Sequence, residues 1–433
     1  MIEFPRYDSY KDSGISWINV IPAHWEIERA KWLFQKMERP VRREDNVVTA
    51  FRDGQVTLRT NRRTEGFTNA LQEHGYQGIR KGDLVIHAMD AFAGAIGVSD
   101  SDGKSTPVYS VCISREQFNV NNYFYAYLLR YMARSGYIQA LAKGIRERST
   151  DFRFNDFANL FLPLPSKEEQ DRIVAFLDAK TAEIDEAIAK KQRLIELLHE
   201  QKAILINRAV TQGLNPSAPL RDSGVPWIGQ IPSHWEVKRL KYLLSEPLKY
   251  GANEEAKEEN LTDPRYIRIT DFGDDGVLRK DTYKSLSYAK AKDYLLKDGD
   301  ILFARSGATV GKSFFFNAFN GQACFAGYLI KATVRSNLIS SRFLYLYSKS
   351  PIFEAWKCSI FSQATIQNIG ADKYAVLPVI VPPLGEQNDI IEVTNAIEME
   401  ISGLVENEVT SINYLNELKR VIISEAVTGK IKI

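Results

Sequence analysis

The 433-residue sequence has few cysteines, little net charge and no long uncharged apolar run. Its three cysteines, Cys112, Cys324 and Cys358, are too few and too scattered for a disulfide framework or for paired zinc ligands. No apolar segment reaches the roughly 18 residues needed to cross a bilayer. The first residues also lack the cationic start and apolar core of a signal peptide. We therefore expect a cytoplasmic protein without a metal site and without a membrane partner.

Neither sign of charge dominates, because the sequence has 56 Lys and Arg residues and 54 Asp and Glu residues, which gives a net charge of +2. A nucleic-acid-binding protein often has a strong basic excess, so any such site here has to be a local cluster. Hydrophobic residues make up 44% and charged residues 25% of the chain, which is ordinary for a folded protein. This composition excludes intrinsic disorder for most of the sequence.

Complete catalytic motifs are also missing. The segment around Gly307 and Gly311 resembles a phosphate-binding loop, but that motif needs four residues between its glycines and this segment has three. The nearest match to the tetrapeptide of an adenine aminomethyltransferase, Asp263–Tyr266, lacks the second proline. No histidine lies at metal or triad spacing from a cysteine or carboxylate; His24 and His234 are expected to be structural partners of the tryptophans that follow them. We therefore expect no catalytic residues.

What the sequence does contain is a duplication. Residues 12–26, DSGISWINVIPAHWE, and residues 222–236, DSGVPWIGQIPSHWE, are identical at ten of fifteen positions. Their offset is 210, and three later matches follow at an offset of 217: Gly82-Asp83 with Gly299-Asp300, Glu169-Gln170 with Glu386-Gln387, and the AVT at 209–211 with that at 426–428. A period of about 215 residues is far longer than a solenoid repeat. Each copy is therefore expected to be a domain-sized unit.

Each copy has a strand-rich part followed by a long helical part. The strand-rich part combines aromatic and β-branched residues with Gly and Asp, the pattern of short strands joined by turns, and includes one expected helix, at Asn121–Arg134 or Ser341–Phe353. The proline clusters in PLPSKEEQ and VPPLGEQ then precede segments almost free of Gly and Pro. Proline before and glycine after are the usual helix boundaries, so each copy is expected to end in a helix of about 40 residues.

Apolar residues on these helices recur at spacings of seven and four, as at the seam of a coiled coil. The pattern matches between the copies at the offset of 217, so the expected partner of each helix is the other. The expected fold is α+β, with two strand-rich domains, each followed by a long helix, and the helices packed as an antiparallel coiled coil with pseudo-twofold (circular) symmetry. The predicted boundaries are 1–165, 166–212, 213–382, 383–428 and a tail at 429–433. The predicted seam is Ile184, Ile188, Ile195, Leu198, Leu205, Ile401, Val405, Ile412, Leu415 and Ile422.

Arginines gather in loop-rich stretches of both copies, beside Gly, Ser, Thr and Asn. This combination suits phosphate contacts and the bidentate reading of guanine edges. The candidate DNA-binding residues, chosen by loop position and chemistry, are Arg59, Arg62, Arg63, Arg146, Arg148 and Arg153 in the first copy and Lys249, Tyr250, Arg268, Arg305, Lys312 and Gln363 in the second.

The chain resembles the specificity subunit of type I restriction-modification systems over essentially its whole length. The resemblance is carried by the two DSG-x-x-W-I-x-x-I-P-x-H-W-E segments, by PLPSKEEQ and VPPLGEQ before the helices, and by AVTQG and AVTGK after them. It implies two target recognition domains, each reading half of a bipartite site in double-stranded DNA, and helices that set the spacer and dock two methyltransferase subunits. It also implies that S-adenosylmethionine, ATP and Mg belong to the methyltransferase and restriction subunits, with no cofactor in this one.

Two other classes are compatible with parts of the sequence. A coiled-coil adaptor whose two heads bind proteins explains the duplication and the helices, but gives no reason for arginine-rich loops in both heads. Strongly salt-dependent DNA binding is expected of a specificity subunit and not of such an adaptor, so this measurement distinguishes the two classes. A self-contained DNA enzyme is disfavoured because its motifs are missing.

Overall fold

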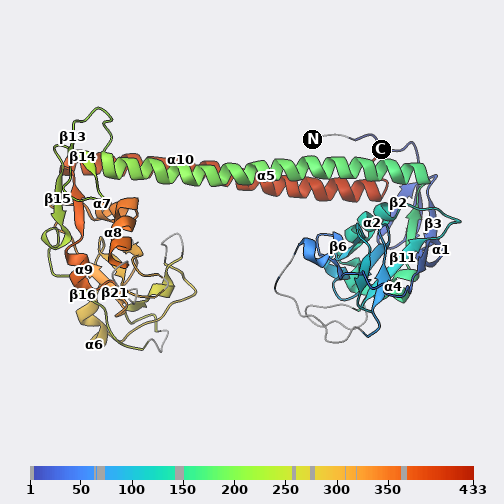
Figure 1. The fold of residues 1–433 in the computed structure, drawn as a ribbon, viewed down its shortest axis with the longest axis horizontal. Helices are drawn as coiled ribbons and strands as arrows, with labels where there is room; N and C mark the ends of the chain where they lie inside the picture. The colour runs from blue at the N-terminus through green and yellow to red at the C-terminus, as the bar shows by residue number, and fades with distance from the viewer. Residues whose placement is uncertain are drawn as a thin grey trace. The chain divides into compact units, whose positions relative to one another are not determined.

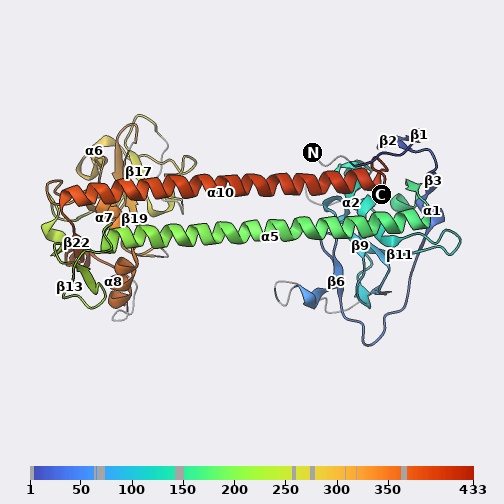
Figure 2. The same ribbon diagram turned by 90° about the horizontal axis from the view of Figure 1, so that it is seen from above.

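The computed structural model describes residues 4–62, 65, 74–141, 151–255, 260–273, 278–307, 309–317, 319–361 and 368–433. The chain divides into two compact units: Met1–Gln192 with Val409–Ile433, called unit 1, and Arg193–Glu408, called unit 2. Each unit consists of a strand-rich head and a part of both long helices, α5 (Lys167–Gln212) and α10 (Leu384–Val427) (Figures 1 and 2). The predicted α+β class with two strand-rich domains and long helices is confirmed.

Both heads are built on the same four-stranded antiparallel sheet. In unit 1 the strand order is β4-β11-β8-β9, and in unit 2 it is β16-β21-β18-β19. The central strands β8 and β18 are apolar because both of their faces are covered: Ile86 and Phe303 belong to the larger core of their unit, whereas Val85 and Leu302 belong to a smaller one. The strands are β4 (Phe34–Lys36), β8 (Leu84–His87), β9 (Ile96–Val98), β11 (Tyr109–Ser114), β16 (Lys249–Tyr250), β18 (Ile301–Ala304), β19 (Ser313–Phe315) and β21 (Leu329–Ala332).

Two strand pairs connect each head to the start of its long helix. A hairpin, β1-β2 or β13-β14, is formed by the repeated sequence segment, and the next strand pairs antiparallel with the strand that precedes the long helix. Both copies use these strand pairs. This explains why the first segment of one copy resembles the first segment of the other, and why the segments before the long helices also match. The strands are β1 (Tyr10–Ile15), β2 (Ile18–Pro22), β3 (Glu26–Arg29), β12 (Phe161–Leu164), β13 (Leu220–Asp222), β14 (Gln230–Pro232), β15 (Glu236–Arg239) and β22 (Pro378–Val381).

The remaining strands differ between the heads. Unit 1 adds two antiparallel pairs, β5-β6 and β7-β10, whereas unit 2 adds the parallel pair β17-β20. These additions build the smaller cores and are not repeated in the sequence. Their bounds are β5 (Val48–Ala50), β6 (Val56–Leu58), β7 (Gln77–Ile79), β10 (Gly103–Ser105), β17 (Arg265–Ile267) and β20 (Ala323–Phe325).

Short helices cover the sheets, and one prediction about them is wrong. The helix expected at Asn121–Arg134 is α2 (Asn122–Arg134), whose first turn is capped by the Asn121 side chain. The helix expected at Ser341–Phe353 is instead two helices, α7 and α8. Because Pro351 lacks an amide hydrogen and its ring disfavours a preceding helical turn, the first helix ends before it and the second starts at it. The shorter helices are α1 (Ala30–Leu33), α3 (Tyr137–Leu141), α4 (Phe154–Ala158), α6 (Tyr288–Ala291), α7 (Ser341–Tyr347), α8 (Pro351–Phe361) and α9 (Ala371–Ala375).

The repeated Gly-Asp pair forms the turn before each central strand. Gly82 and Gly299 have φ angles of 93° and 92°, in the left-handed region that favours glycine. The carboxylates that follow accept hydrogen bonds from backbone amides three residues earlier, at 2.7 Å for Asp83 and 2.8 Å for Asp300. The match between the copies therefore reflects one turn geometry used twice.

The repeated His-Trp-Glu and Glu-Gln segments meet in space within each unit. Nε2 of His24 lies 3.0 Å from Oε2 of Glu169, and Nε2 of His234 lies 2.8 Å from Oε2 of Glu386. The histidines are thus structural, as expected, but their hydrogen-bond partners are the glutamates at the start of the long helices rather than the adjacent tryptophans. Trp235 donates to the same glutamate, at 2.9 Å.

Within each unit the two long helices pack against each other in opposite directions. In unit 1 the first half of α5 packs on the second half of α10, with Ile184 and Ile422 7% and 3% exposed. In unit 2 the second half of α5 lies with the first half of α10, and Ile401 is 5% exposed. Leu205 departs from the predicted seam, since it is 37% exposed and Ile206 packs against the core in its place. The other predicted seam residues are half-buried: Ile188, Ile195, Leu198, Val405, Ile412 and Leu415.

Candidate nucleic-acid interface

One end of the unit 2 sheet brings three of the predicted DNA-binding residues into one region. Tyr250 is the last residue of β16, Arg305 follows β18, and Lys312 precedes β19. The guanidinium carbon of Arg305 lies 4.9 Å from the centre of the Tyr250 ring. The Tyr250 hydroxyl is fixed in turn, because it accepts a hydrogen bond from the backbone amide of Ala371 at 2.8 Å. Arginine and tyrosine are therefore held against each other at the edge of the head.

Arg305 has hydrogen-bonding capacity left over. Its Nε is buried and has no hydrogen-bond partner among the described residues. A buried donor without a partner is unfavourable, and an arginine resting on an aromatic ring presents its remaining donors to an incoming acceptor. Tyr328, whose carbonyl accepts from the Arg305 amide at 3.0 Å, is 64% exposed beside it. The region thus offers a cation and two accessible aromatic rings.

Lys349 is a basic residue of this region that no sequence pattern marked as a candidate. Its Nζ donates to the Ser313 carbonyl at 2.7 Å, which places it beside the start of β19. Burial lowers the pKa of Lys349 to about 8, and the positive charge of Lys312 contributes to the shift. Only tertiary packing brings it to the loop, since 37 residues separate Lys349 from Lys312.

Lys249 and Arg268, the other predicted residues of unit 2 that the structure describes, already have partners. Lys249 donates to the Asp293 carbonyl at 2.5 Å. Arg268 forms two bonds to the fully buried Asp271, at 3.1 Å from Nε and 2.7 Å from Nη2, and a third to the Thr282 carbonyl at 3.0 Å. Only Nη1 of Arg268 has no partner among the described residues. The structure thus gives Arg268 a role in holding the turn after β17.

Two of the predicted residues of unit 1, Arg59 and Arg62, lie on the same turn. Arg59 begins the turn after β6 and donates to the Thr49 hydroxyl at 3.3 Å. Arg62 forms an ion pair with Asp53 at 2.7 Å, and Arg153 forms one with Asp151, also at 2.7 Å. Four predicted residues fall outside the described part of the chain: Arg63, Arg146, Arg148 and Gln363.

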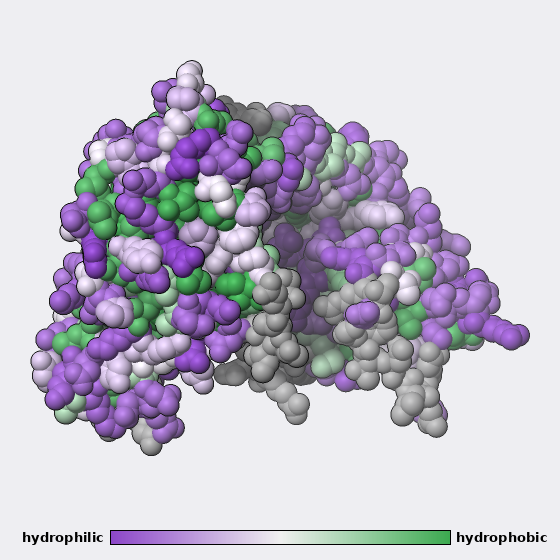
Figure 3. Space-filling view, turned by 60° about the vertical axis from the view of Figure 1, so that its left-hand side comes forward, coloured by the Kyte–Doolittle hydropathy of each residue, from purple (hydrophilic) through white to green (hydrophobic). Residues whose placement is uncertain are grey.

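The described surface is largely polar on the face that Figure 3 shows, where hydrophobic residues form small separate areas. No described helix combines the length and apolarity of a membrane span. Among the described residues, no three His, Cys, Asp or Glu side chains are grouped as metal ligands. The chemistry that the site offers is therefore cationic and aromatic, which suits phosphates and nucleobases.

Comparisons with known proteins agree with this chemistry. A family model described as the type I restriction modification DNA specificity domain matches residues 232–411. The type I restriction enzyme MjaVIII specificity subunit of Methanocaldococcus jannaschii is 23% identical over 359 residues, which are 76% of each chain. Among solved structures, a chain from a study of assembly and conformational transition of the type I R-M system aligns with a TM-score of 0.67 and 19% identity, covering 95% of this chain and 99% of that one. The HsdS subunit of Thermoanaerobacter tengcongensis aligns with a TM-score of 0.55 and 18% identity, covering 95% and 98%.

Proposed function

Because the chain belongs to the specificity subunits of type I restriction-modification systems, we propose that its two heads, residues 1–165 and 213–382, each recognise one half of a bipartite site in double-stranded DNA. The long helices, residues 166–212 and 383–428, set the spacer between the half-sites. In this proposal the chain supplies DNA specificity and no catalytic residue.

The single observation that supports this assignment is a shared scaffold with different additions. Both heads have the same four-stranded order and the same connections to their long helices, whereas β5-β6 and β7-β10 in one head are replaced by the parallel pair β17-β20 in the other. A common scaffold allows two heads to approach a duplex in the same way. Different additions allow each head to read a different sequence.

In the second head we assign DNA contacts to Tyr250, Arg305 and Lys312, with Lys249 beside them. We assign Arg305 to a base edge, because an arginine side chain can donate two parallel hydrogen bonds to O6 and N7 of guanine. Lys312 and Lys349 suit phosphates, which fix position but carry no sequence information. In the first head the proposed contacts are Arg59, Arg62, Arg63, Arg146, Arg148 and Arg153.

We also propose the partners that a non-catalytic specificity subunit requires. Two methyltransferase subunits dock on the helices and bring S-adenosylmethionine for adenine methylation, and restriction subunits bring ATP and Mg. The complex acts on DNA in the cytoplasm. Since the helix pair contributes to both units, it offers each methyltransferase subunit a comparable surface.

A methylome comparison of the host with and without this gene tests the proposal. We expect N6-methyladenine to disappear from one gapped, two-part motif when the gene is deleted and to return on complementation. An unchanged methylome in a strain whose methyltransferase gene is expressed would contradict the assignment and favour the two-headed protein-binding adaptor. The adaptor also predicts that the purified chain shows no salt-dependent affinity for DNA.

A further inference from the structure

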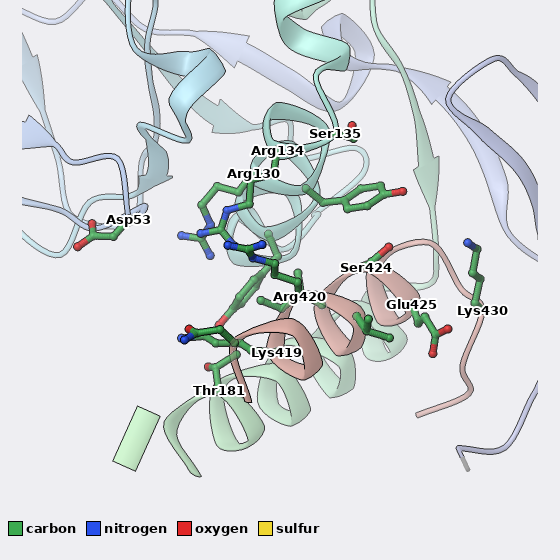
Figure 4. Close-up of a pocket in the computed structure, with 15 residues that line it drawn as sticks. Asp53, Arg130, Arg134, Ser135, Thr181, Lys419, Arg420, Ser424, Glu425 and Lys430 are labelled. Carbon is green, nitrogen blue, oxygen red and sulfur yellow. The ribbon is translucent and has the colours of Figure 1, made fainter. Parts of the chain in front are cut away.

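A hollow of about 930 Å³ lies in unit 1, between α2 of the head and the adjoining stretches of α5 and α10. Figure 4 shows that Arg130 and Arg134 reach it from α2, whereas Lys419 and Arg420 reach it from α10. Thr181, Ser135 and Ser424 add hydroxyl groups to its wall. None of these residues is among the reading-loop candidates of the first head.

Five basic residues line the hollow, the fifth being Lys430, together with the acidic Asp53 and Glu425. In the described part of the chain, Lys419 alone among these basic residues forms an ion pair, with Asp185 at 2.6 Å. Arg130 donates to the Gly54 carbonyl at 3.3 Å and lies 4.6 Å from the centre of the Tyr127 ring. Within the described ranges, no carboxylate forms an ion pair with Arg130, Arg134 or Arg420, and Asp53, which also lines the hollow, is paired with Arg62.

These guanidinium groups are close enough to affect one another. Burial lowers the pKa of Arg130, and the charge of Arg134 acts in the same direction, whereas Tyr127, Asp53 and Asp178 act in the opposite direction. Burial likewise lowers the pKa of Arg134, with a contribution from Arg420. Arginine nevertheless stays protonated in proteins, so the hollow gathers positive charges that repel one another. An anion placed between them removes that repulsion.

Helix stability alone explains only part of this arrangement. Arg134 is the last residue of α2, where a cation interacts favourably with the helix dipole. That effect gives no reason for a second arginine to approach from another helix. Arg420 is also exposed and could turn toward solvent.

The other copy keeps a basic residue at two of the four corresponding positions and lacks it at the other two. At the offset of 217, Lys419 and Arg420 correspond to Lys202 and Ala203. Counted from the helix-capping residues Asn121 and Ser340, Arg130 and Arg134 correspond to Lys349 and Phe353, and Phe353 is fully buried. A partner that docks on both copies alike requires the same residues in both. The cluster therefore suits a ligand that the two copies contact differently.

We propose that this hollow binds a phosphate of the DNA backbone next to the half-site that unit 1 reads. Arginine forks match phosphate oxygens in a bidentate way, and serine and threonine hydroxyls are common additional donors to the backbone. The site adds affinity and fixes the position of the duplex without adding sequence preference. This inference rests on the proposed function.

The test uses the full-length chain with Arg134→Gln and Arg420→Gln combined. Both residues are accessible to solvent, although Arg134 is partly covered, so we expect the fold to be retained, and thermal unfolding checks this. Binding to two labelled duplexes of unrelated sequence is measured over a range of salt concentrations. We expect affinity to fall about fivefold to tenfold on both duplexes, and the slope of log K against log salt to fall by about 1. The variant that combines Arg134→Lys with Arg420→Lys keeps both charges, so its slope of log K against log salt should stay closer to that of the parent chain.

The matched control combines Lys190→Gln with Arg193→Gln, which removes the same charge from exposed residues that are ion-paired with Glu186 and Glu196. If the arginine variant binds DNA like this control, the phosphate site is wrong while the proposed function stands. If the parent chain itself shows no salt-dependent DNA binding, the proposed function fails first. Loss of tripolyphosphate binding without loss of DNA binding would assign the hollow to a free phosphate ligand and overturn the inference.

Discussion

Oε1 of Gln387 accepts a hydrogen bond from the backbone amide of Ser340 at 2.7 Å, which ties the start of α10 to the start of α7. Its Nε2 donates to the carbonyls of Pro382 at 2.8 Å and Leu338 at 3.2 Å. Gln170 accepts in the same way from the Asn121 amide at 2.8 Å. One buried amide thus joins each head to its long helix, and this explains the repeated Glu-Gln pair.

Replacing Gln387 with Ala should lower the free energy of unfolding by about 2–3 kcal/mol, because buried backbone groups lose their partners. Urea unfolding of the full chain measures the change. Asn388→Ala is the control, since it removes a neighbouring amide that is exposed on the same helical turn. Equal effects of the two substitutions would show that the buried amide contributes no specific stability.

Acid should weaken the contact that the Glu169 carboxylate makes with Tyr7 and His24 in unit 1. Burial of the Glu169 carboxyl opposes its ionisation, but hydrogen bonds from Tyr7 and His24 outweigh it, so the pKa of Glu169 lies below its usual 4.5. A carboxyl whose pKa is lowered by folding stabilises the fold above its unfolded pKa, and this contribution disappears as the pH falls through the folded pKa. We expect stability to decline below pH 4.5, and less steeply in Glu169→Gln. Glu168→Gln, on the exposed side of the same turn, is the control.

Arg268→Ala should mainly destabilise unit 2. Removing the guanidinium leaves the buried Asp271 carboxylate without its ion-pair partner, which we expect to lower the free energy of unfolding by about 2–3 kcal/mol, less than for a fully buried pair because Arg268 is partly exposed. Urea unfolding gives the value. An unchanged stability together with relaxed sequence choice at one base would instead assign Arg268 to DNA reading.

Arg305→Ala should change recognition rather than stability. Its Nε has no partner among the described residues, so truncation breaks no buried ion pair. If the guanidinium reads a base edge, binding weakens by about 1–3 kcal/mol and one position of one half-site becomes degenerate. Methylome sequencing of cells that carry the variant detects this. Uniform weakening across sequences would assign Arg305 to a phosphate.

The helix pair should tolerate substitutions very unevenly. Ile184→Ala removes a 7% exposed side chain packed between α5 and α10, and we expect it to lower the free energy of unfolding by about 2–4 kcal/mol. Leu205→Ala, which the heptad pattern treats as equivalent, should lower it by less than about 1 kcal/mol because Leu205 is 37% exposed. Comparable losses at both sites would place Leu205 in the seam after all.

The long helices could be predicted because local signals define them: prolines before, glycines after, and an apolar pattern between. The division of Ser341–Phe353 into α7 and α8 was also visible in principle, since Pro351 marks it. The partners of the arginines were not predictable, because a charge pattern cannot show that Arg268 is held by Asp271 while Nε of Arg305 is left without one. Lys349 shows the same limit, since its environment is created by strands far away in the sequence.

Unit 1 is discontinuous in sequence, whereas unit 2 is continuous. On the ribosome, residues 193–408 are therefore complete before the helix segment that unit 1 needs has been made. Domains generally fold as units during synthesis, so the head that is translated first has to wait, with Leu177 and Ile184 uncovered, until Ile422 and Val427 emerge. Premature termination within the last stretch of α10 would thus damage the fold of the first head rather than that of the second.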